Sequence, residues 1–347
     1  MNRRSFVKSS IMGGVAATLF NPVYSTGYFD GKEINTSTVA ITTGNDRADL
    51  TFRALKPFSE QIRRDIGNKT VVIKPNNVAV NIQLASTHVE TLEGILEFLK
   101  SIKKSGNVII AESAANGPTF DGFSNFGYTK LLDRYPVKLK DLDHEKYEVI
   151  YVFDEKDFRP HPVRVSAMLL SRDTYTISAA KLKTHDRAVV TLSLKNIVFG
   201  APIKDDGYTF GRDRREGSKS DKPVVHGSGF RGINFNLYDL APKLHPDLAV
   251  IDGFEGMEGN GPSRGTKVDH RVCIASTDWL AADRVAVELM GVDFSKVGYL
   301  NYCAQTGLGI ADLNKIKISG ENISDHRREY KLHENIDKQL IWLQPAG

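Results

Sequence analysis

The chain of 347 residues is long enough to bury a sizeable core, either as one large α/β domain or as two lobes. Charged residues make up 25% of it and aromatic residues 9%, a composition that excludes a disordered, collagen-like or coiled-coil protein. The formal net charge is +4, and it falls to +1 without the three basic residues Arg3, Arg4 and Lys8 of a removable leader. Bulk charge therefore gives no support for a nucleic-acid partner, and we expect none.

Residues 1–25 have the features of a removable export signal. A basic start precedes an apolar run at residues 11–20, which is too short for a stable membrane span, and Ser25 is a small residue suited to cleavage. The paired arginines resemble the twin-arginine (Tat) signal peptide. This predicts export by the Tat machinery, to a bacterial periplasm or otherwise out of the cytoplasm, with no stable membrane span in the mature chain 26–347. The alternative is an ordinary amphipathic N-terminal helix.

Cys273 and Cys303 are the only cysteines of the chain. Two thiolates cannot supply the four ligands of an iron–sulfur cluster, so we expect no cluster held by this chain's own sulfurs. The two could form a disulfide in an oxidising compartment, but the preferred interpretation is a buried free thiol at each position.

The first third of the mature chain predicts a βαβ unit. In chain order, the expected elements are a strand at 38–42, a helix at 46–66, a strand at 70–74, a helix at 88–104 and a strand at 107–111. Thr87 is the candidate N-cap of the second helix, and His88 is expected to act in the capping turn. This order indicates an α/β fold with a mainly parallel or mixed sheet and helices on both faces.

The middle of the chain is less regular. Strands are expected at 149–153, 163–165 and 175–178. Residues 201–232 then lose the apolar pattern and become rich in glycine and charge. We interpret this long loop as a lid, at which the domain 26–347 could divide into two lobes; the alternative is a disordered insertion.

The C-terminal third begins with a strand at 247–252 and a glycine-rich loop from Asp252 to Pro262. The elements expected after it are a strand at 272–275 and helices at 278–290 and 296–305. The glycine spacing does not match a dinucleotide-binding fingerprint, because Pro262 interrupts it and no amphipathic helix follows directly.

Three lysines and a histidine lie among apolar residues at 181–185 and 194–196. Because removing an ammonium group from water costs several kcal/mol, such lysines need an anionic partner. Residues 190–195 fit either a strand or a buried helix, and in both Thr191 and Lys195 share a face. This face is expected to line an anion pocket. The alternative is a solvated face whose lysines extend to water.

The glycine-rich loop supplies the complementary acids. It starts where a strand ends, which in a parallel sheet is the edge at which ligands collect. Asp252, Glu255 and Glu258 offer carboxylates for a metal ion or for proton transfer. A glycine-rich turn with solvated acids explains the pattern equally well.

Polar residues also follow both strands of the βαβ unit, and these strand ends should meet at the same edge. The residues expected to converge in one cleft are Lys74, Glu112, Lys181, Lys183, His185, Lys195, Asp252 and Glu258. The alternative that the residues leave open is a buried ion-pair network that only holds the fold together.

Several of these blocks resemble a known family. The blocks are 73–76, 112–113, 181–185, 194–196 with Gly200, and 252–262. In this order they resemble the signature blocks of the domain of unknown function 362 (DUF362) family over nearly the whole mature chain, and His226 falls where such proteins tend to place a histidine. Many relatives carry ferredoxin-type cysteine clusters in an added domain, which implies redox settings, but this chain has no such domain.

The functional hypothesis is an exported enzyme for a small anionic substrate, a carboxylate or a phosphate. The expected substrate-binding residues are Lys74, Asn76, Lys181, Lys183, Lys195, Asn196 and His226. His185, Asp252 and Glu258 are the candidate catalytic acids and bases, and Glu112, Asp252 and Glu258 could hold a divalent metal ion. The alternatives are a non-catalytic protein that binds an anion or cofactor, and a redox accessory protein working with an iron–sulfur partner.

Overall fold

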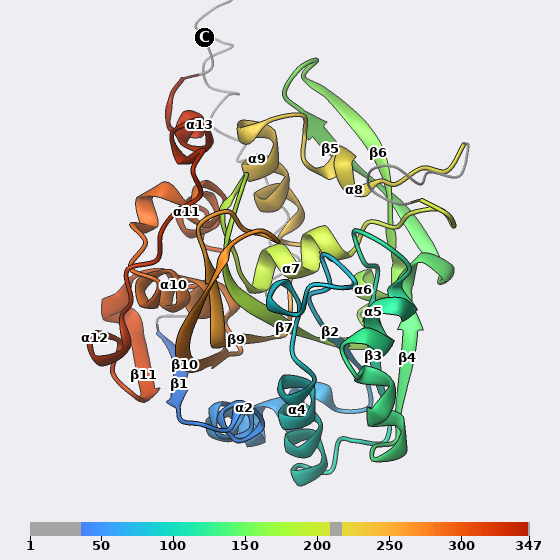
Figure 1. Cartoon of the computed structure of the whole chain (residues 1–347), viewed down its shortest axis with the longest axis vertical. Helices are drawn as coiled ribbons and strands as arrows, with labels where there is room; N and C mark the ends of the chain where they lie inside the picture. Colours follow the sequence, from blue (N-terminus) through green and yellow to red (C-terminus); the bar gives the residue numbers. More distant parts are fainter. Residues whose placement is uncertain (1–35, 209–216, 346–347) are drawn as a thin grey trace, which may run out of the picture. The chain divides into compact units, whose positions relative to one another are not determined.

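A mixed sheet of nine strands forms the centre of the computed structural model, which describes residues 36–208 and 217–345 (Figure 1). Its strands are β1 (Ser37–Thr43), β2 (Thr70–Lys74), β3 (Val108–Glu112), β4 (Val137–Asp141), β7 (Thr174–His185), β8 (Val189–Thr191), β9 (Leu248–Glu258), β10 (Thr266–Ser276) and β11 (Ile316–Gly320). Their order is β11-β1-β10-β9-β7-β2-β3-β4, with β8 paired to β7. The neighbours β9, β7, β2, β3 and β4 are all parallel, which confirms the expected sheet and its βαβ unit.

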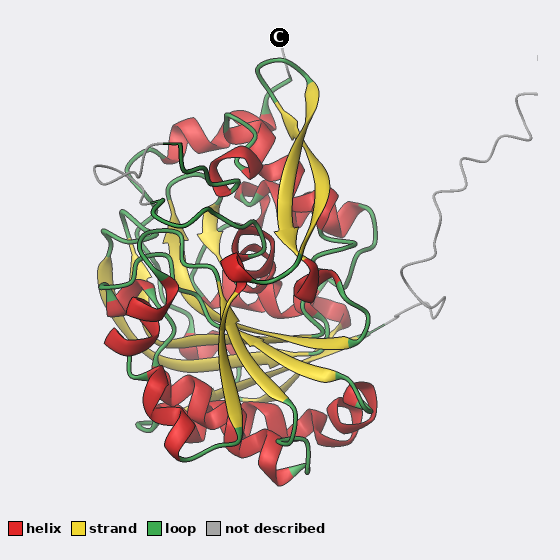
Figure 2. Ribbon diagram, turned by 90° about the vertical axis from the view of Figure 1, so that its right-hand side faces the viewer, coloured by secondary structure: helices red, strands yellow, loops and turns green. Residues whose placement is uncertain are grey.

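Helices cover both faces of the sheet (Figure 2). One hydrophobic core contains side chains of α2 (Arg47–Leu55), α3 (Ser59–Ile66), α4 (Val89–Ser101) and α5 (Thr119–Asn125). The other contains side chains of α7 (Ser193–Gly200), α9 (Phe230–Leu240), α10 (Trp279–Leu289) and α11 (Gly298–Gln305). Within β2, Val71 and Ile73 pack into the first core and Val72 into the second, so this strand is apolar on both faces.

The remaining elements are short or lie outside the sheet. They are the hairpin β5 (Tyr147–Asp154) and β6 (Arg159–Ser166), and the helices α6 (Ala167–Leu170), α8 (Lys222–Val225), α12 (Ile323–His326) and α13 (Ile336–Gln339). Residues 1–25, the predicted signal peptide, lie outside the described residues, as does the centre of the predicted lid. The described residues form one compact unit, and the division into two lobes near 201–232 stays a prediction.

Two helix boundaries differ from the prediction for identifiable reasons. The helix expected at 46–66 is interrupted at Pro57, where a 3₁₀ turn separates α2 from α3. The N-cap of α4 is His88, whose side chain accepts a hydrogen bond from the backbone N–H of Glu90. Thr87 does not cap, because its hydroxyl accepts from Asn76 N and donates to Ala179 O. The expected role of His88 in the capping turn is confirmed.

The glycine-rich segment that begins at Asp252 is mostly a strand, so the expected loop is wrong in extent. β9 continues to Glu258 and pairs with β10 as an antiparallel hairpin. A Cβ atom on Gly256 would overlap the hydroxyl of Tyr330, so this glycine permits close packing within the protein. Only the residues after Glu258 form the turn.

The ambiguous segment at 190–195 contains both elements. β8 ends at Thr191, and α7 begins at Ser193. The buried carboxylate of Asp283 accepts hydrogen bonds from the backbone N–H groups of Ser193 and Leu194 at 2.8 and 3.1 Å, which satisfies the start of α7. Burial raises the pKa of Asp283 to about 7, against the effect of these hydrogen bonds.

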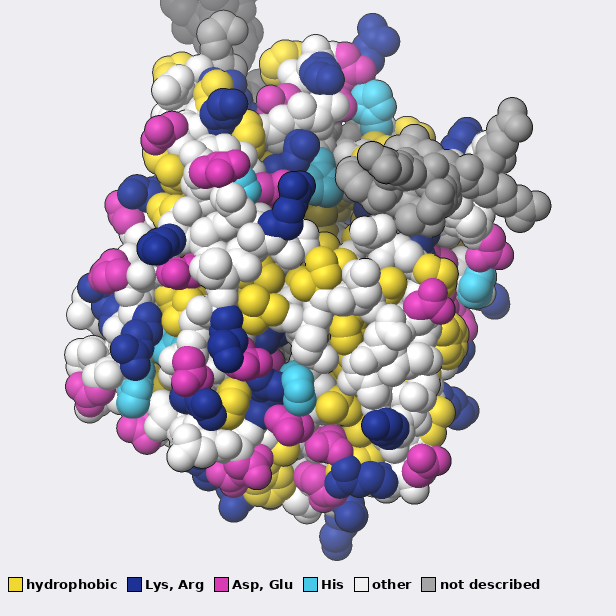
Figure 3. Space-filling model, viewed as in Figure 1, with side chains coloured by type: hydrophobic (Ala, Val, Ile, Leu, Met, Phe, Trp, Pro, Cys, Tyr) yellow, Lys and Arg dark blue, Asp and Glu magenta, His cyan; other side chains and the backbone are white. Residues whose placement is uncertain are grey.

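Cys273 and Cys303 are both buried and free, which confirms the preferred interpretation of the thiols. Burial raises the pKa of Cys273 to about 12, so this thiol is inert at neutral pH. Within the two described ranges, no helix is long and apolar enough to cross a membrane. On the surface shown in Figure 3, acidic and basic side chains are interspersed among the described residues.

Candidate functional site

The carboxyl ends of β2 and β3 bring Lys74 and Glu112 together, as the strand pattern predicted. The strands are parallel neighbours, and the Lys74 Nζ atom lies 2.7 Å from Glu112 Oε1 and 2.8 Å from Oε2. Both side chains are about 2% exposed. Lys74 is therefore a paired lysine, and its ammonium group is already neutralised inside the protein.

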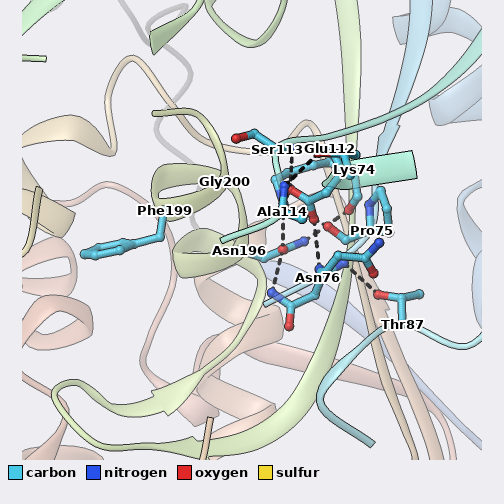
Figure 4. Close-up of polar contacts among 12 residues, drawn as sticks. Lys74, Pro75, Asn76, Thr87, Glu112, Ser113, Ala114, Asn196, Phe199 and Gly200 are labelled. Carbon is cyan, nitrogen blue, oxygen red and sulfur yellow. Dashed lines mark hydrogen bonds and ion pairs between the residues drawn. The ribbon is translucent and has the colours of Figure 1, made fainter. Parts of the chain in front are cut away.

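Asn196 of α7 connects this ion pair to the rest of the edge (Figure 4). Its Oδ1 atom accepts hydrogen bonds from Lys74 Nζ at 3.1 Å and from Asn76 Nδ2 at 2.9 Å. Its Nδ2 group donates to the backbone oxygen of Lys74 and to the Ser178 hydroxyl. Because a Cβ atom on Gly200 would overlap the Lys74 side chain, the last turn of α7 can approach β2 only with glycine there.

Lys183 contacts Asn76 but does not line the cavity. Its Nζ atom donates to Asn76 Oδ1 at 2.6 Å and to the backbone oxygen of Ala85 at 2.7 Å, both uncharged acceptors. Burial, together with the neighbouring lysines, holds the pKa of Lys183 well below its usual value. Lys183 therefore supports Asn76 within the protein.

Lys181 and Asp252 form a second buried ion pair, with Nζ 3.0 Å from Oδ2. Arg47 of α2 lies 3.5 Å from the other oxygen of Asp252 and 3.0 Å from Glu255. Burial opposes ionisation of Asp252, but Lys181 and Arg47 together hold its pKa below the usual value. This cluster is the internal ion-pair network that the sequence left open as an alternative.

The three carboxylates expected to hold a metal ion do not form one site. Glu258 is six residues beyond Asp252 on β9, roughly 20 Å along an extended strand, and accepts a hydrogen bond from the backbone N–H of Lys331. Glu112 lies three strands from Asp252 in the sheet order, roughly 14 Å away. Among residues 36–208 and 217–345, no group of three or more His, Cys, Asp or Glu residues could hold a metal ion.

A cavity of about 890 Å³ opens at the same sheet edge. The predicted site residues that line it are Lys74, Asn76, Glu112, His185, Lys195, Asn196 and His226. Lys181, Lys183, Asp252 and Glu258 do not belong to its wall. Described residues of the 201–232 segment, among them Tyr208 and Lys222, also line the cavity. The cavity therefore gathers part of the predicted set of residues, and of the expected acids only Glu112 belongs to its wall.

Lys195 of α7 is the distinctive residue of the wall. It is 5% exposed, and within the described part of the chain its amine makes no hydrogen bond or ion pair. Its recorded contact is with the Phe199 ring, whose centroid lies 4.3 Å from Nζ. Burial lowers the pKa of Lys195 to about 7; Asp186 opposes this shift, and Arg187 and Lys74 add to it. The hydroxyl of Thr191, also in the wall, is buried without a hydrogen-bond partner among the described residues. Thr191 and Lys195 thus line the same cavity, but they do so from two elements, β8 and α7, and not from one face of a single element as expected.

Two uncharged histidines complete this wall. The Nδ1–H group of His226 donates to the backbone oxygen of Lys222 at 2.9 Å, which leaves a lone pair on Nε2. His185 Nδ1 accepts a hydrogen bond from the backbone N–H of Arg187 at 3.0 Å, and Asp186 Oδ1 lies 3.1 Å from the same nitrogen. Because Nδ1 is the acceptor, the ring proton of the neutral imidazole is on Nε2. Burial lowers both pKa values, that of His226 to about 3 and that of His185 well below 6.5. The pair thus offers one acceptor and one donor.

Several residues of the wall were not singled out from the sequence. Arg187 lies two residues after the end of the lysine motif, and Lys222 precedes His226 by about one helical turn. These positions were an available signal. Lys222 Nζ donates to the backbone oxygen of Pro202 at 2.7 Å, and burial lowers its pKa to about 8. His333 and Asn335 come from the C-terminal tail, and no local pattern connects them with the site.

Comparisons with known proteins identify proteins similar to this chain. A thylakoid-associated protein of Synechocystis sp. is 23% identical over 242 residues, which cover 69% of this chain and 68% of that protein. A crystal structure of a Thermotoga maritima protein matches with a TM-score of 0.39 and 11% identity, over 72% of this chain and 60% of the other. The sequence profile described as "Domain of unknown function (DUF362)" matches residues 71–288, which include all the strand ends of the site. The chain therefore belongs to the DUF362 family.

Proposed function

We propose that the cavity is the active site of an enzyme that acts on a small anionic molecule. The observation that carries this proposal is Lys195, a buried lysine at the cavity wall without an anionic partner among the described residues. Among the other buried lysines of this region, Lys74, Lys181 and Lys204 pair with carboxylates, and Lys183 and Lys222 donate hydrogen bonds to uncharged oxygen atoms. A ligand carboxylate or phosphate would supply the missing charge.

The other groups of the wall fit the same ligand. Arg187 adds a permanent positive charge, and the free hydroxyl of Thr191 adds a hydrogen-bond donor. His226 can accept a proton through Nε2, and His185 can donate a hydrogen bond from Nε2. Lys74, Glu112 and Asn196 then act as positioning residues, because their hydrogen bonds fix α7 against β2.

Thermal unfolding with inorganic phosphate and with pyruvate, each at saturating concentration, tests the binding step. A bound ligand stabilises only the folded state, so we expect Tm to rise by a few degrees. Lys195→Met should lose the rise, and Lys130→Met, which changes an exposed lysine outside the cavity wall, should keep it. An equal rise in all three proteins would refute the role of Lys195.

A turnover assay separates the enzyme from a non-catalytic binding protein. For an enzyme, His226→Gln should retain ligand-induced stabilisation and lose most of the conversion, since it removes the proton acceptor. If a ligand binds tightly and is never consumed by the wild type, the cavity belongs to a binding protein that delivers its ligand to a partner, including a redox partner.

We further propose that the protein is exported by the twin-arginine route. The support is the leader pattern at residues 1–25. A fusion of residues 1–35 to a reporter should leave the cytoplasm, and replacing both Arg3 and Arg4 by lysine should stop its export. Unchanged localisation after this replacement would contradict the proposal.

A further inference from the structure

Lys195 lines the cavity, and its amine donates no hydrogen bond to any described residue. The other buried lysines near it either donate hydrogen bonds to protein groups or lie outside the cavity wall. Lys74 is held by a carboxylate, and Lys183 lies outside the wall. Lys222 is in the wall, but its Nζ atom donates to backbone oxygens, the nearest at 2.7 Å. A lone pair directed at a ligand is therefore available from Lys195 and not from its neighbours.

The surroundings of Lys195 favour the uncharged amine. The ionisable groups around it are Lys74 at the end of β2, Lys183 and His185 of β7, Asp186 and Arg187 of the following turn, and Lys222 and His226 of α8 and its end. The nearest acid, Asp186, makes no ion pair with it. Because burial and the cations oppose protonation, the pKa of about 7 leaves roughly half of the amine neutral at pH 7.

We propose that Lys195 forms an imine with the carbonyl carbon of the ligand, so that the substrates are small aldehydes or ketones that carry a carboxylate or a phosphate. This inference rests on the proposed function, because the anionic group must first bring the ligand into the cavity. Arg187 can hold that group while Lys195 reacts.

The step balances without an oxidant or a reductant. The lone pair of the Lys195 amine attacks the carbonyl carbon, and the π bond of the carbonyl breaks as its electron pair moves to the oxygen, to which the Nε2–H group of His185 donates a hydrogen bond. Nε2 of His226 takes one proton from the nitrogen and passes it to this oxygen, which becomes a hydroxyl. The C–O bond then breaks, and the hydroxyl leaves with the second nitrogen proton as one water molecule, which gives the imine. A protonated imine withdraws electrons from the adjacent carbon, so the reaction class is proton removal or bond cleavage at that carbon.

Reductive trapping on the wild-type protein tests the imine. The protein is incubated with pyruvate, and separately with pyridoxal 5′-phosphate, in the presence of cyanoborohydride, and labelled lysines are identified by peptide mass spectrometry. We expect the label on Lys195 to exceed that on Lys130 by roughly tenfold or more, since an exposed lysine is almost fully protonated at pH 7. Lys222 should also carry less label than Lys195, because its amine donates to backbone oxygens. The labelling rate should rise with pH through about 7 and then level off.

The outcomes separate this inference from the proposed function. If Lys195 stays unlabelled while phosphate or pyruvate still raises Tm, the imine is overturned and the anion site remains. If there is neither label nor stabilisation, both proposals fail. As a second variant, Lys195→Arg keeps a positive charge in the wall, so it should keep part of the stabilisation by phosphate and lose the label.

Discussion

At the scale of single residues, the partner of each lysine decides its role. Lys74 and Lys181 each contact a buried carboxylate, and such pairs resist disruption because one partner alone would be a buried unpaired charge. Lys195 has no such partner among the described residues, and its pKa is lowered to about 7. The first two lysines therefore hold the fold, and the third is available to a ligand.

The lowered pKa of Lys195 predicts a dependence of stability on pH. In the unfolded chain, the lysine keeps a pKa of about 10.4, so between pH 7 and 10.4 only the unfolded state binds the proton. The free energy of unfolding therefore rises with pH in this window, by up to about 1.4 kcal/mol per unit from this residue. Urea unfolding between pH 7 and 9.5 should show a steeper rise for the wild type than for Lys195→Met. Equal slopes would contradict the lowered pKa.

The pair of Lys74 and Glu112 predicts a strong loss of stability when it is broken. Glu112→Gln leaves the ammonium group of Lys74 buried without its counter-charge, which should cost about 3–5 kcal/mol in the free energy of unfolding. The double variant Lys74→Met/Glu112→Gln removes both charges and should recover much of this loss. A double-mutant cycle from urea unfolding measures the difference, and additive effects would show that the pair is not coupled.

At the scale of elements, the position of α7 determines the site, because this helix carries both Lys195 and Asn196. Asp283 accepts hydrogen bonds from the first backbone N–H groups of the helix, and Asn196 donates a hydrogen bond to β2. Gly200 allows the last turn of the helix to pack against the Lys74 side chain. The helix therefore depends on contacts with two distant parts of the chain, Asp283 of α10 and Lys74 of β2.

Gly200→Ala tests this dependence. The added methyl group overlaps the Lys74 side chain, so we expect a loss of roughly 1–3 kcal/mol in stability and weaker ligand binding. Gly106→Ala is the matched control, because no atom lies within 4 Å of a Cβ added at Gly106. Equal Tm values for the two variants would show that α7 tolerates a wider approach to β2.

The sequence pattern predicted the parts of the fold that depend on neighbouring residues. β2 and β3 follow from β-branched runs, and their parallel pairing was enough to bring Lys74 and Glu112 together. In contrast, the pattern in β7 indicates only that Lys181 and Lys183 share a face. It does not indicate that Arg47 of α2 would contact Asp252, the partner of Lys181. Nor does it indicate that pairing with β10 would keep the glycine-rich residues after Asp252 in strand β9. These outcomes depend on contacts between distant segments.

At the scale of the whole molecule, the C-terminal tail contributes to the site. Gln339 of α13 accepts a hydrogen bond from the backbone N–H of Val189 at 2.7 Å and donates one to the backbone oxygen of His185 at 2.9 Å. The tail thereby fixes the turn between β7 and β8, which carries Arg187. Nothing in the charged pattern of the tail predicts this contact.

Replacing this glutamine tests the role of the tail. Gln339→Ala leaves two buried backbone groups without partners, so we expect a loss of about 1–3 kcal/mol in stability. Ligand binding should weaken as well, because His185 and Arg187 lose their support. Lys338→Ala, at an exposed neighbouring position, should change neither quantity. Unchanged ligand affinity in Gln339→Ala would place the tail outside the site.

The central claim is that the cavity binds a small anion through Lys195, and calorimetric titration tests it most directly. Inorganic phosphate and pyruvate are titrated into the wild type, Lys195→Met and Lys130→Met at pH 7. We predict that at least one anion binds the wild type and Lys130→Met equally, and that Lys195→Met weakens this binding by roughly tenfold or more, equivalent to about 1.4 kcal/mol. Equal affinity in all three proteins, or no binding of either anion to the wild type, would contradict the account.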